Sequence, residues 1–142
     1  MIKTRNFSQT ELERSSKAKK YGIDNSIPNE YIQNAYELLC GLQAIRDALG
    51  KPINITSGYR CERLNNIVGG VRNSSHLKGW AADIQVDGMG AKALYNWLSG
   101  FLIGSKMKFG QLLYEQKGTT SWVHFSIRDE GGQRCQIKEI YV

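Results

Sequence analysis

The chain has 142 residues, and its 19 lysines and arginines against 13 aspartates and glutamates give a formal net charge of +6. This length predicts one domain, and a composition with 41% hydrophobic and 23% charged residues excludes a wholly disordered chain. No run approaches the roughly 20 apolar residues that cross a bilayer, and no apolar leader opens the sequence, so we expect no membrane span and no signal peptide.

The first 28 residues are polar and mixed in charge, and we expect them to form an N-terminal arm packed on the domain. From Asn29 to Leu49, apolar residues recur at steps of three and four, which predicts a long amphipathic helix that ends at Gly50 before Pro52. Residues 29–142 then form the main domain.

The middle of the chain alternates between short strand and helix patterns. Residues 53–57 and 80–86 read as strands, because each has β-branched character and runs into a turn. A short helix is expected over 60–68, ended by a glycine pair, and a second long helix over 91–102, whose apolar residues share one face.

The last third is typical of a meander. Residues 109–116 and 121–128 are strand-like and separated by a hairpin-length loop that contains glycine, and 134–142 alternates again after a second turn. The sequence therefore predicts an α+β domain in which helices pack against a small antiparallel sheet.

The two histidines of the chain, His76 and His124, both lie among strand and turn signals. Together with Asp83 they make a sufficient ligand set for a catalytic zinc. On a helix, His76 and Asp83 would be about 10.5 Å apart along the axis, but Gly79 lets the chain fold back and bring them to one ion. Ordinary surface or core roles remain the alternative, because spacing alone does not prove ligation.

The predicted hairpin places a carboxylate near this group. If residues 117–120 form the loop, Glu115 pairs with Trp122 and Leu113 with His124. Side chains of one parity share a face, so Glu115 and His124 are diagonal neighbours about 7–8 Å apart. Glu115 is then a candidate general base for an attacking water, or else a solvated strand carboxylate, and Ser121 faces away.

Arg60 follows a predicted strand, at a place where loops often carry function. A guanidinium there can bind a carboxylate through two hydrogen bonds or polarise a scissile carbonyl. The alternative is an ordinary surface arginine.

The pattern S-x-H-x-x-G-x-A-x-D over residues 74–83, followed by W-V-H at 122–124, closely resembles the zinc D-Ala-D-Ala carboxypeptidase family. That family includes vancomycin-resistance dipeptidases, phage endolysins and hedgehog-like domains. The segment I-T-S-G-Y-R at 55–60 is similar to the arginine segment of the family. The resemblance runs from the long first helix to the end of the chain and leaves only the arm outside.

The resemblance implies one Zn²⁺ held by His76, Asp83 and His124, with Arg60 holding or polarising the substrate. Two further side chains of the motifs, Ser74 and Trp122, are expected to line the substrate site.

The position of the base departs from the common pattern of the family. Many relatives have an acid three residues before the last histidine, where this chain has Ser121. A subgroup instead ends the preceding strand in Tyr-Glu, which matches Tyr114 and Glu115 and agrees with the parity of the hairpin.

The expected function is hydrolysis of a peptide bond in peptidoglycan stem peptides, at D-Ala-D-Ala or at a neighbouring bond, by a monomeric zinc carboxypeptidase or endopeptidase. A cytoplasmic or phage-associated protein is expected, and its positive charge would aid its approach to an anionic cell wall. One alternative is a binding module that keeps the zinc and has lost turnover. Another is a basic nucleic-acid binder, although no recognition helix or aromatic RNA-binding motif is present, so we expect no nucleic-acid partner.

Overall fold

The computed structural model describes all residues, 1–142. The helices are α1 (Gln9–Glu13), α2 (Ser16–Lys20), α3 (Ile32–Leu49), α4 (Glu62–Ile67) and α5 (Ala91–Ser105), with short 3₁₀ turns η1 (Asn29–Tyr31) and η2 (Ser75–Lys78). The strands are β1 (Asn54–Ser57), β2 (Ala81–Gln85), β3 (Gln111–Lys117), β4 (Thr120–Ser126) and β5 (Gln136–Tyr141). Every helix and strand expected from the sequence is present, and the α+β class is confirmed.

The five strands form one sheet in the order β1-β2-β4-β3-β5. The first four strands pair antiparallel, as expected, but β5 runs parallel to β3. The expectation of a purely antiparallel sheet is therefore wrong. The cause lies in the loop after β4, which brings the chain back to the start of β3. There Cys135 N–H donates a hydrogen bond to Phe109 O, and Gln136 N–H donates one to Gly110 O. The next strand can then only run in the direction of β3.

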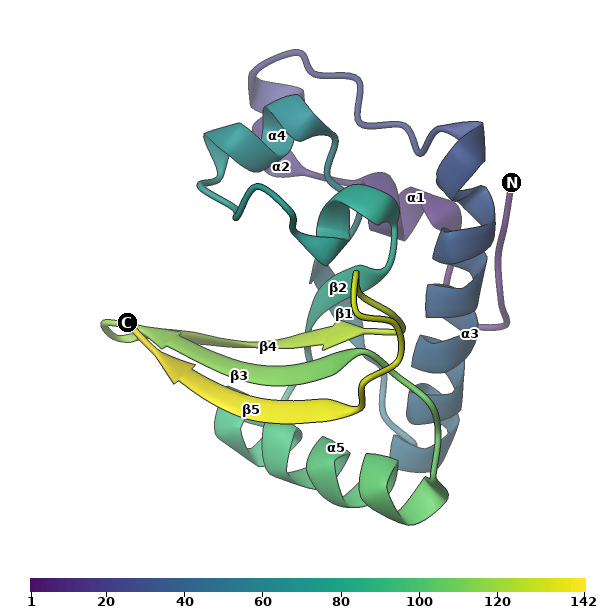
Figure 1. Ribbon diagram of the computed structural model, residues 1–142, viewed down its shortest axis with the longest axis vertical. Helices are drawn as coiled ribbons and strands as arrows, with labels where there is room; N and C mark the ends of the chain where they lie inside the picture. The colour runs from purple at the N-terminus through teal and green to yellow at the C-terminus, as the bar shows by residue number, and fades with distance from the viewer.

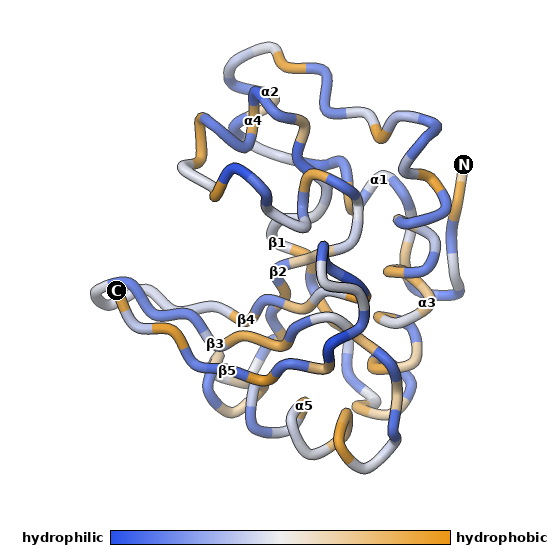
Figure 2. Tube along the Cα trace, viewed as in Figure 1, coloured by the Kyte–Doolittle hydropathy of each residue, from blue (hydrophilic) through white to orange (hydrophobic).

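The core lies between the sheet and two long helices. Helix α5 packs under β3 and β4, and α3 stands across the end of the sheet (Figure 1). Apolar stretches of the strands and of both helices meet in this interior (Figure 2). Leu38, Leu42 and Ile45 of α3 are fully buried, at the spacing that predicted this helix. As expected, α3 ends at Gly50, whose φ of 72° is a left-handed cap.

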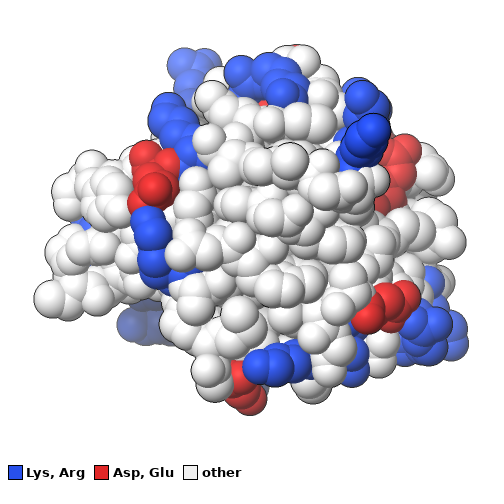
Figure 3. All heavy atoms as spheres, turned by 90° about the horizontal axis from the view of Figure 1, so that it is seen from below, with Lys and Arg blue, Asp and Glu red and all other residues white.

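The outer face of α5 carries little charge. Lys92 is the single charged residue of this helix. In the view from below, lysine, arginine and acidic side chains gather around the rim and leave the centre of the face uncharged (Figure 3). No helix of the protein is both long and apolar enough to span a bilayer.

The arm of residues 1–28 is part of the core. Leu12 is fully buried and Phe7 is 3% exposed, and both belong to the main apolar cluster. Leu12 O accepts a hydrogen bond from Tyr59 N–H, and a Cβ added to Gly58 would lie 2.6 Å from the same oxygen. Only glycine allows the arm to approach β1 this closely.

Candidate functional site

Three segments bring the predicted metal ligands together. Asp83 on β2 and His124 on β4 are directly opposite each other in the antiparallel ladder. His76 lies on η2, and the chain reverses at Gly79, whose φ is 77°. This reversal is the one expected from the sequence, because a glycine takes up the left-handed conformation without steric cost.

The ligand atoms of these three residues lie within 4.8 Å of one another. Asp83 Oδ1 lies 3.3 Å from His76 Nε2 and 3.3 Å from His124 Nδ1. The two imidazole rings meet edge to face, with centroids 5.1 Å apart. His76 is 2% exposed and His124 is 8% exposed, so the group is shielded from bulk water.

Hydrogen bonds fix the orientation of His76. Its Nδ1 lies 2.7 Å from Gly58 O, a carbonyl that accepts only, so Nδ1 carries the proton and the Nε2 lone pair, beside Asp83, is free to bind a metal. Ser74 Oγ accepts a hydrogen bond from the backbone N–H of His76 and so caps η2. Ser74, expected to contact substrate, thus also positions a candidate ligand.

Burial and charge favour the protonation states that bind a metal. Burial lowers the pKa of His76 below its ordinary value, more than the neighbouring Asp83 raises it. For Asp83, burial acts to raise the pKa, but the two adjacent histidines, His76 and His124, outweigh it, and the pKa lies well below its usual range. A neutral imidazole and an ionised carboxylate are the forms in which these residues are ligands.

This donor set fits zinc. Histidine nitrogens and aspartate oxygens bind zinc at about 2.0–2.2 Å, and a catalytic site uses three protein ligands with a fourth position open. Two such ligands in a tetrahedral arrangement lie about 3.4 Å apart. The separation of Asp83 Oδ1 from each histidine nitrogen is 3.3 Å.

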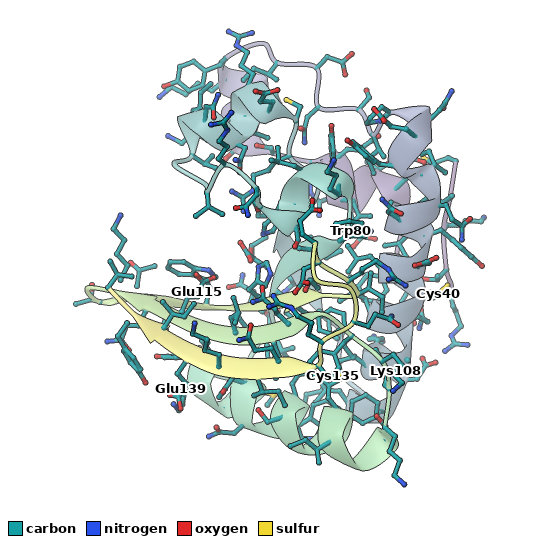
Figure 4. The ribbon with its side chains drawn as sticks, viewed as in Figure 1. Cys40, Trp80, Lys108, Glu115, Cys135 and Glu139 are labelled. Atoms are coloured by element: carbon teal, nitrogen blue, oxygen red, sulfur yellow. The ribbon has the colours of Figure 1, made fainter.

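The register of the β3–β4 hairpin is the predicted one. Glu115 pairs with Trp122 and Leu113 with His124. Glu115 rises from the sheet on the side that faces α4 (Figure 4), and its Oε2 accepts a hydrogen bond of 2.9 Å from the indole N–H of Trp122. Trp122, expected to contact substrate, therefore also holds the candidate base. Ser121 does not line the cleft that contains Glu115.

Arg60 lies on the opposite wall, between β1 and α4. Its Nη1 donates to Asn65 Oδ1 at 3.1 Å. Burial lowers the pKa of the guanidinium, and the charges of Asp83 and Glu115 raise it. An arginine keeps its proton in proteins, so a positive charge faces the two carboxylates.

One cleft of about 900 Å³ is lined by every site residue expected from the sequence: Arg60, Ser74, His76, Asp83, Glu115, Trp122 and His124. Its walls also include arm residues Arg14 to Lys17, the segment after α4 and the turn from Asp129 to Arg134. These last groups were not expected from the sequence, because their place in the cleft depends on the packing of distant segments and on no local motif.

Residues 5–126 match a family model described as Peptidase M15. The chain belongs to the peptidase M15 family. The M15 match contains all three candidate ligands, Arg60 and Glu115. It begins inside the arm and ends before β5, so the expectation that the resemblance leaves the arm out and reaches the end of the chain is wrong.

A second comparison concerns a shorter stretch. Over 62 residues the chain is 44% identical to a protein of Streptomyces albus G named zinc D-Ala-D-Ala carboxypeptidase. The matched stretch is 43% of this chain and 24% of that protein. The match thus spans about a quarter of the length of this relative.

Proposed function

We propose that this M15 protein is a zinc peptidase that hydrolyses a peptide bond in peptidoglycan stem peptides, and that His76, Asp83 and His124 hold the zinc. The observation that carries the proposal is the convergence of these three ligand atoms within 4.8 Å in a cleft that also contains Arg60 and Glu115. When bound, zinc supplies Lewis acidity, which polarises a carbonyl and makes a water more acidic.

Glu115 acts as the general base of the reaction. Its carboxylate accepts the proton of the attacking water and later donates it to the leaving amine. The indole of Trp122 holds one carboxylate oxygen, Oε2, and leaves the other, Oε1, available for this proton. Because β3 and β4 are paired along their whole length, the base keeps a fixed distance from His124.

Arg60 supplies positive charge to the substrate. Its guanidinium lies in the cleft wall and forms no ion pair with a carboxylate of the protein, so it has N–H donors available for the substrate. It binds either a carboxylate of the peptide or the carbonyl oxygen that becomes negative during attack.

The substrate class is supported by the relative whose printed name is a zinc D-Ala-D-Ala carboxypeptidase. The cleft, of about 900 Å³, is large enough for a short peptide. Cleavage at D-Ala-D-Ala and at a neighbouring bond of the stem peptide are both included in the proposal.

The test combines metal analysis with a peptidase assay. Purified protein is expected to contain one zinc per chain and to release D-alanine or a shortened stem peptide from muropeptides, as read by mass spectrometry. Stoichiometric zinc without cleavage of any stem peptide would contradict the enzymatic proposal and leave a zinc-containing binding module. Absence of bound zinc would contradict both.

A further inference from the structure

The side chain of Arg60 makes few hydrogen bonds in the cleft wall. Its Nε is buried and has no hydrogen-bond partner, and Nη1 has one, Asn65 Oδ1 at 3.1 Å. A long side chain of this kind has about 2 kcal/mol of rotamer entropy to lose. The direction of the guanidinium therefore depends on its surroundings, and above all on Asn65.

Asn65 is oriented so that it presents its oxygen to Arg60. It is 1% exposed, and its amide nitrogen donates to Val71 O at 2.9 Å. Since the nitrogen is used by a carbonyl, the oxygen must be the atom that faces the guanidinium. Gly70 closes the other side, because a Cβ there would lie 2.1 Å from Asn65 Oδ1 and 2.6 Å from Arg60 Nη1.

A second buried asparagine, Asn25, holds the main chain on both sides of Arg60. It is 6% exposed, its Nδ2 donates to Tyr59 O at 2.9 Å, and its Oδ1 accepts from Cys61 N–H at 2.8 Å. Nδ2 also donates to Glu13 O at 2.9 Å, which ties this segment to the arm. One donor and one acceptor of this side chain thus fix the backbone on the two sides of Arg60, and the second donor ties it to the arm.

We propose that Asn65 and Asn25 are positioning residues of the active site, Asn65 for the guanidinium of Arg60 and Asn25 for its backbone. The inference rests on the proposed role of Arg60 toward the substrate. It also gives the arm a part in the reaction, because Asn25 belongs to the arm and contacts no candidate ligand. Every side-chain hydrogen bond of Asn25 is made to a backbone atom, and two of the three flank Arg60.

The test is a double-mutant cycle between each asparagine and Arg60. Asn65→Leu is expected to lower kcat/KM about ten- to a hundredfold in the wild-type background, the effect of one hydrogen bond to a charged group. In an Arg60→Ala background the same change is expected to have less than about a twofold effect, because a positioning residue acts only through the residue it positions. Equal losses in both backgrounds would overturn the proposal for Asn65.

Gly70→Ala provides a second variant in case Asn65→Leu does not fold. The added methyl group displaces the Asn65–Arg60 contact and removes no hydrogen-bonding group, so the same loss and the same dependence on Arg60 are expected. Gly100→Ala on α5, where a Cβ meets nothing within 4 Å, is the matched control.

For Asn25 the matched control is Gln43→Leu. Gln43 also ties the arm to the domain, through Thr4 and Asn6, and it does not contact residues 59–61. Asn25→Ala is expected to lower kcat/KM in an Arg60-dependent manner, whereas Gln43→Leu lowers the melting temperature and leaves kcat/KM unchanged. A similar loss of kcat/KM in the two variants would mean that Asn25 only attaches the arm.

A measurement without substrate separates this inference from the proposed function. In the metal-free protein, NMR is expected to show slow exchange of the buried Arg60 Nε–H with water. In Asn65→Leu this exchange is expected to be at least about tenfold faster, because the guanidinium loses its hydrogen bond to Asn65. An unchanged exchange rate would overturn the role of Asn65 even in a protein that cleaves stem peptides. A wild-type protein that cleaves no stem peptide would contradict the proposed function, and the exchange rate would still test whether Asn65 positions Arg60.

Discussion

Replacement of Glu115 by glutamine tests the general base most cleanly, because it removes the charge and keeps the shape. Glu115 is half-buried on β3, outside the cluster of candidate ligands, and its partner Trp122 donates a hydrogen bond that a glutamine oxygen also accepts. The free energy of unfolding should therefore change by no more than about 0.5 kcal/mol. Bound zinc should be unchanged, since no ligand atom is altered.

The effect on catalysis should be large. General acid–base catalysis contributes about 10²–10⁴ in rate, so Glu115→Gln should raise the activation free energy by about 3–5 kcal/mol. The assay follows product release from a purified stem peptide by mass spectrometry, with zinc content measured on the same sample. The matched control is Ser121→Ala, which changes the position where many relatives carry an acid and should leave the rate unchanged.

Two results would refute this reasoning. Full activity of Glu115→Gln would remove the residue as the base and with it the inference from the parity of the hairpin. Loss of activity in Ser121→Ala, with Glu115→Gln active, would instead place a required group on the opposite face of β4.

Three further predictions concern the fold and the metal. Leu12→Ala should lower the free energy of unfolding by about 2–5 kcal/mol in a urea titration, and a loss below about 1 kcal/mol would mean that the arm is not part of the core. Gly79→Ala forces a φ of 77° on an alanine, so it should lower the free energy of unfolding by about 1–2 kcal/mol. It should also weaken zinc binding, measured by competition with a chelator, and an unchanged zinc affinity would contradict the role of this turn. Free zinc at a hundred times its dissociation constant should stabilise the wild-type protein by about 2.7 kcal/mol. A chelator should therefore lower the melting temperature of the wild type and leave the melting temperature of His124→Ala unchanged.

Two features of the candidate site were predictable from the sequence because their geometry is local. The pairing of Glu115 with Trp122 follows from the length of one hairpin loop, and the alternation of side chains then decides which residues share a face. The reversal at Gly79 is likewise local, since a glycine between His76 and Asp83 permits a turn. The convergence of His76 with His124 rests on the pairing of β2 with β4, which the spacing of the two motifs does not determine.

The parts that could not be predicted depend on contacts between distant segments. The direction of β5 is set by hydrogen bonds from Cys135 and Gln136 to the residues just before β3, and nothing in the alternating pattern of β5 indicates them. The arm is polar on average, so its apolar residues Phe7 and Leu12 give no periodic signal, yet both are buried. Asn25 and Asn65 belong to the same class, because a lone buried asparagine is visible only once its partners are placed.

The most direct test of the central claim is the anomalous diffraction of crystals grown with one equivalent of zinc, measured on both sides of the zinc absorption edge. One strong peak per chain is expected, within about 2.0–2.2 Å of His76 Nε2, His124 Nδ1 and a carboxylate oxygen of Asp83. A zinc peak held by other residues, or no peak beside these three in a protein that cleaves stem peptides, would contradict that claim.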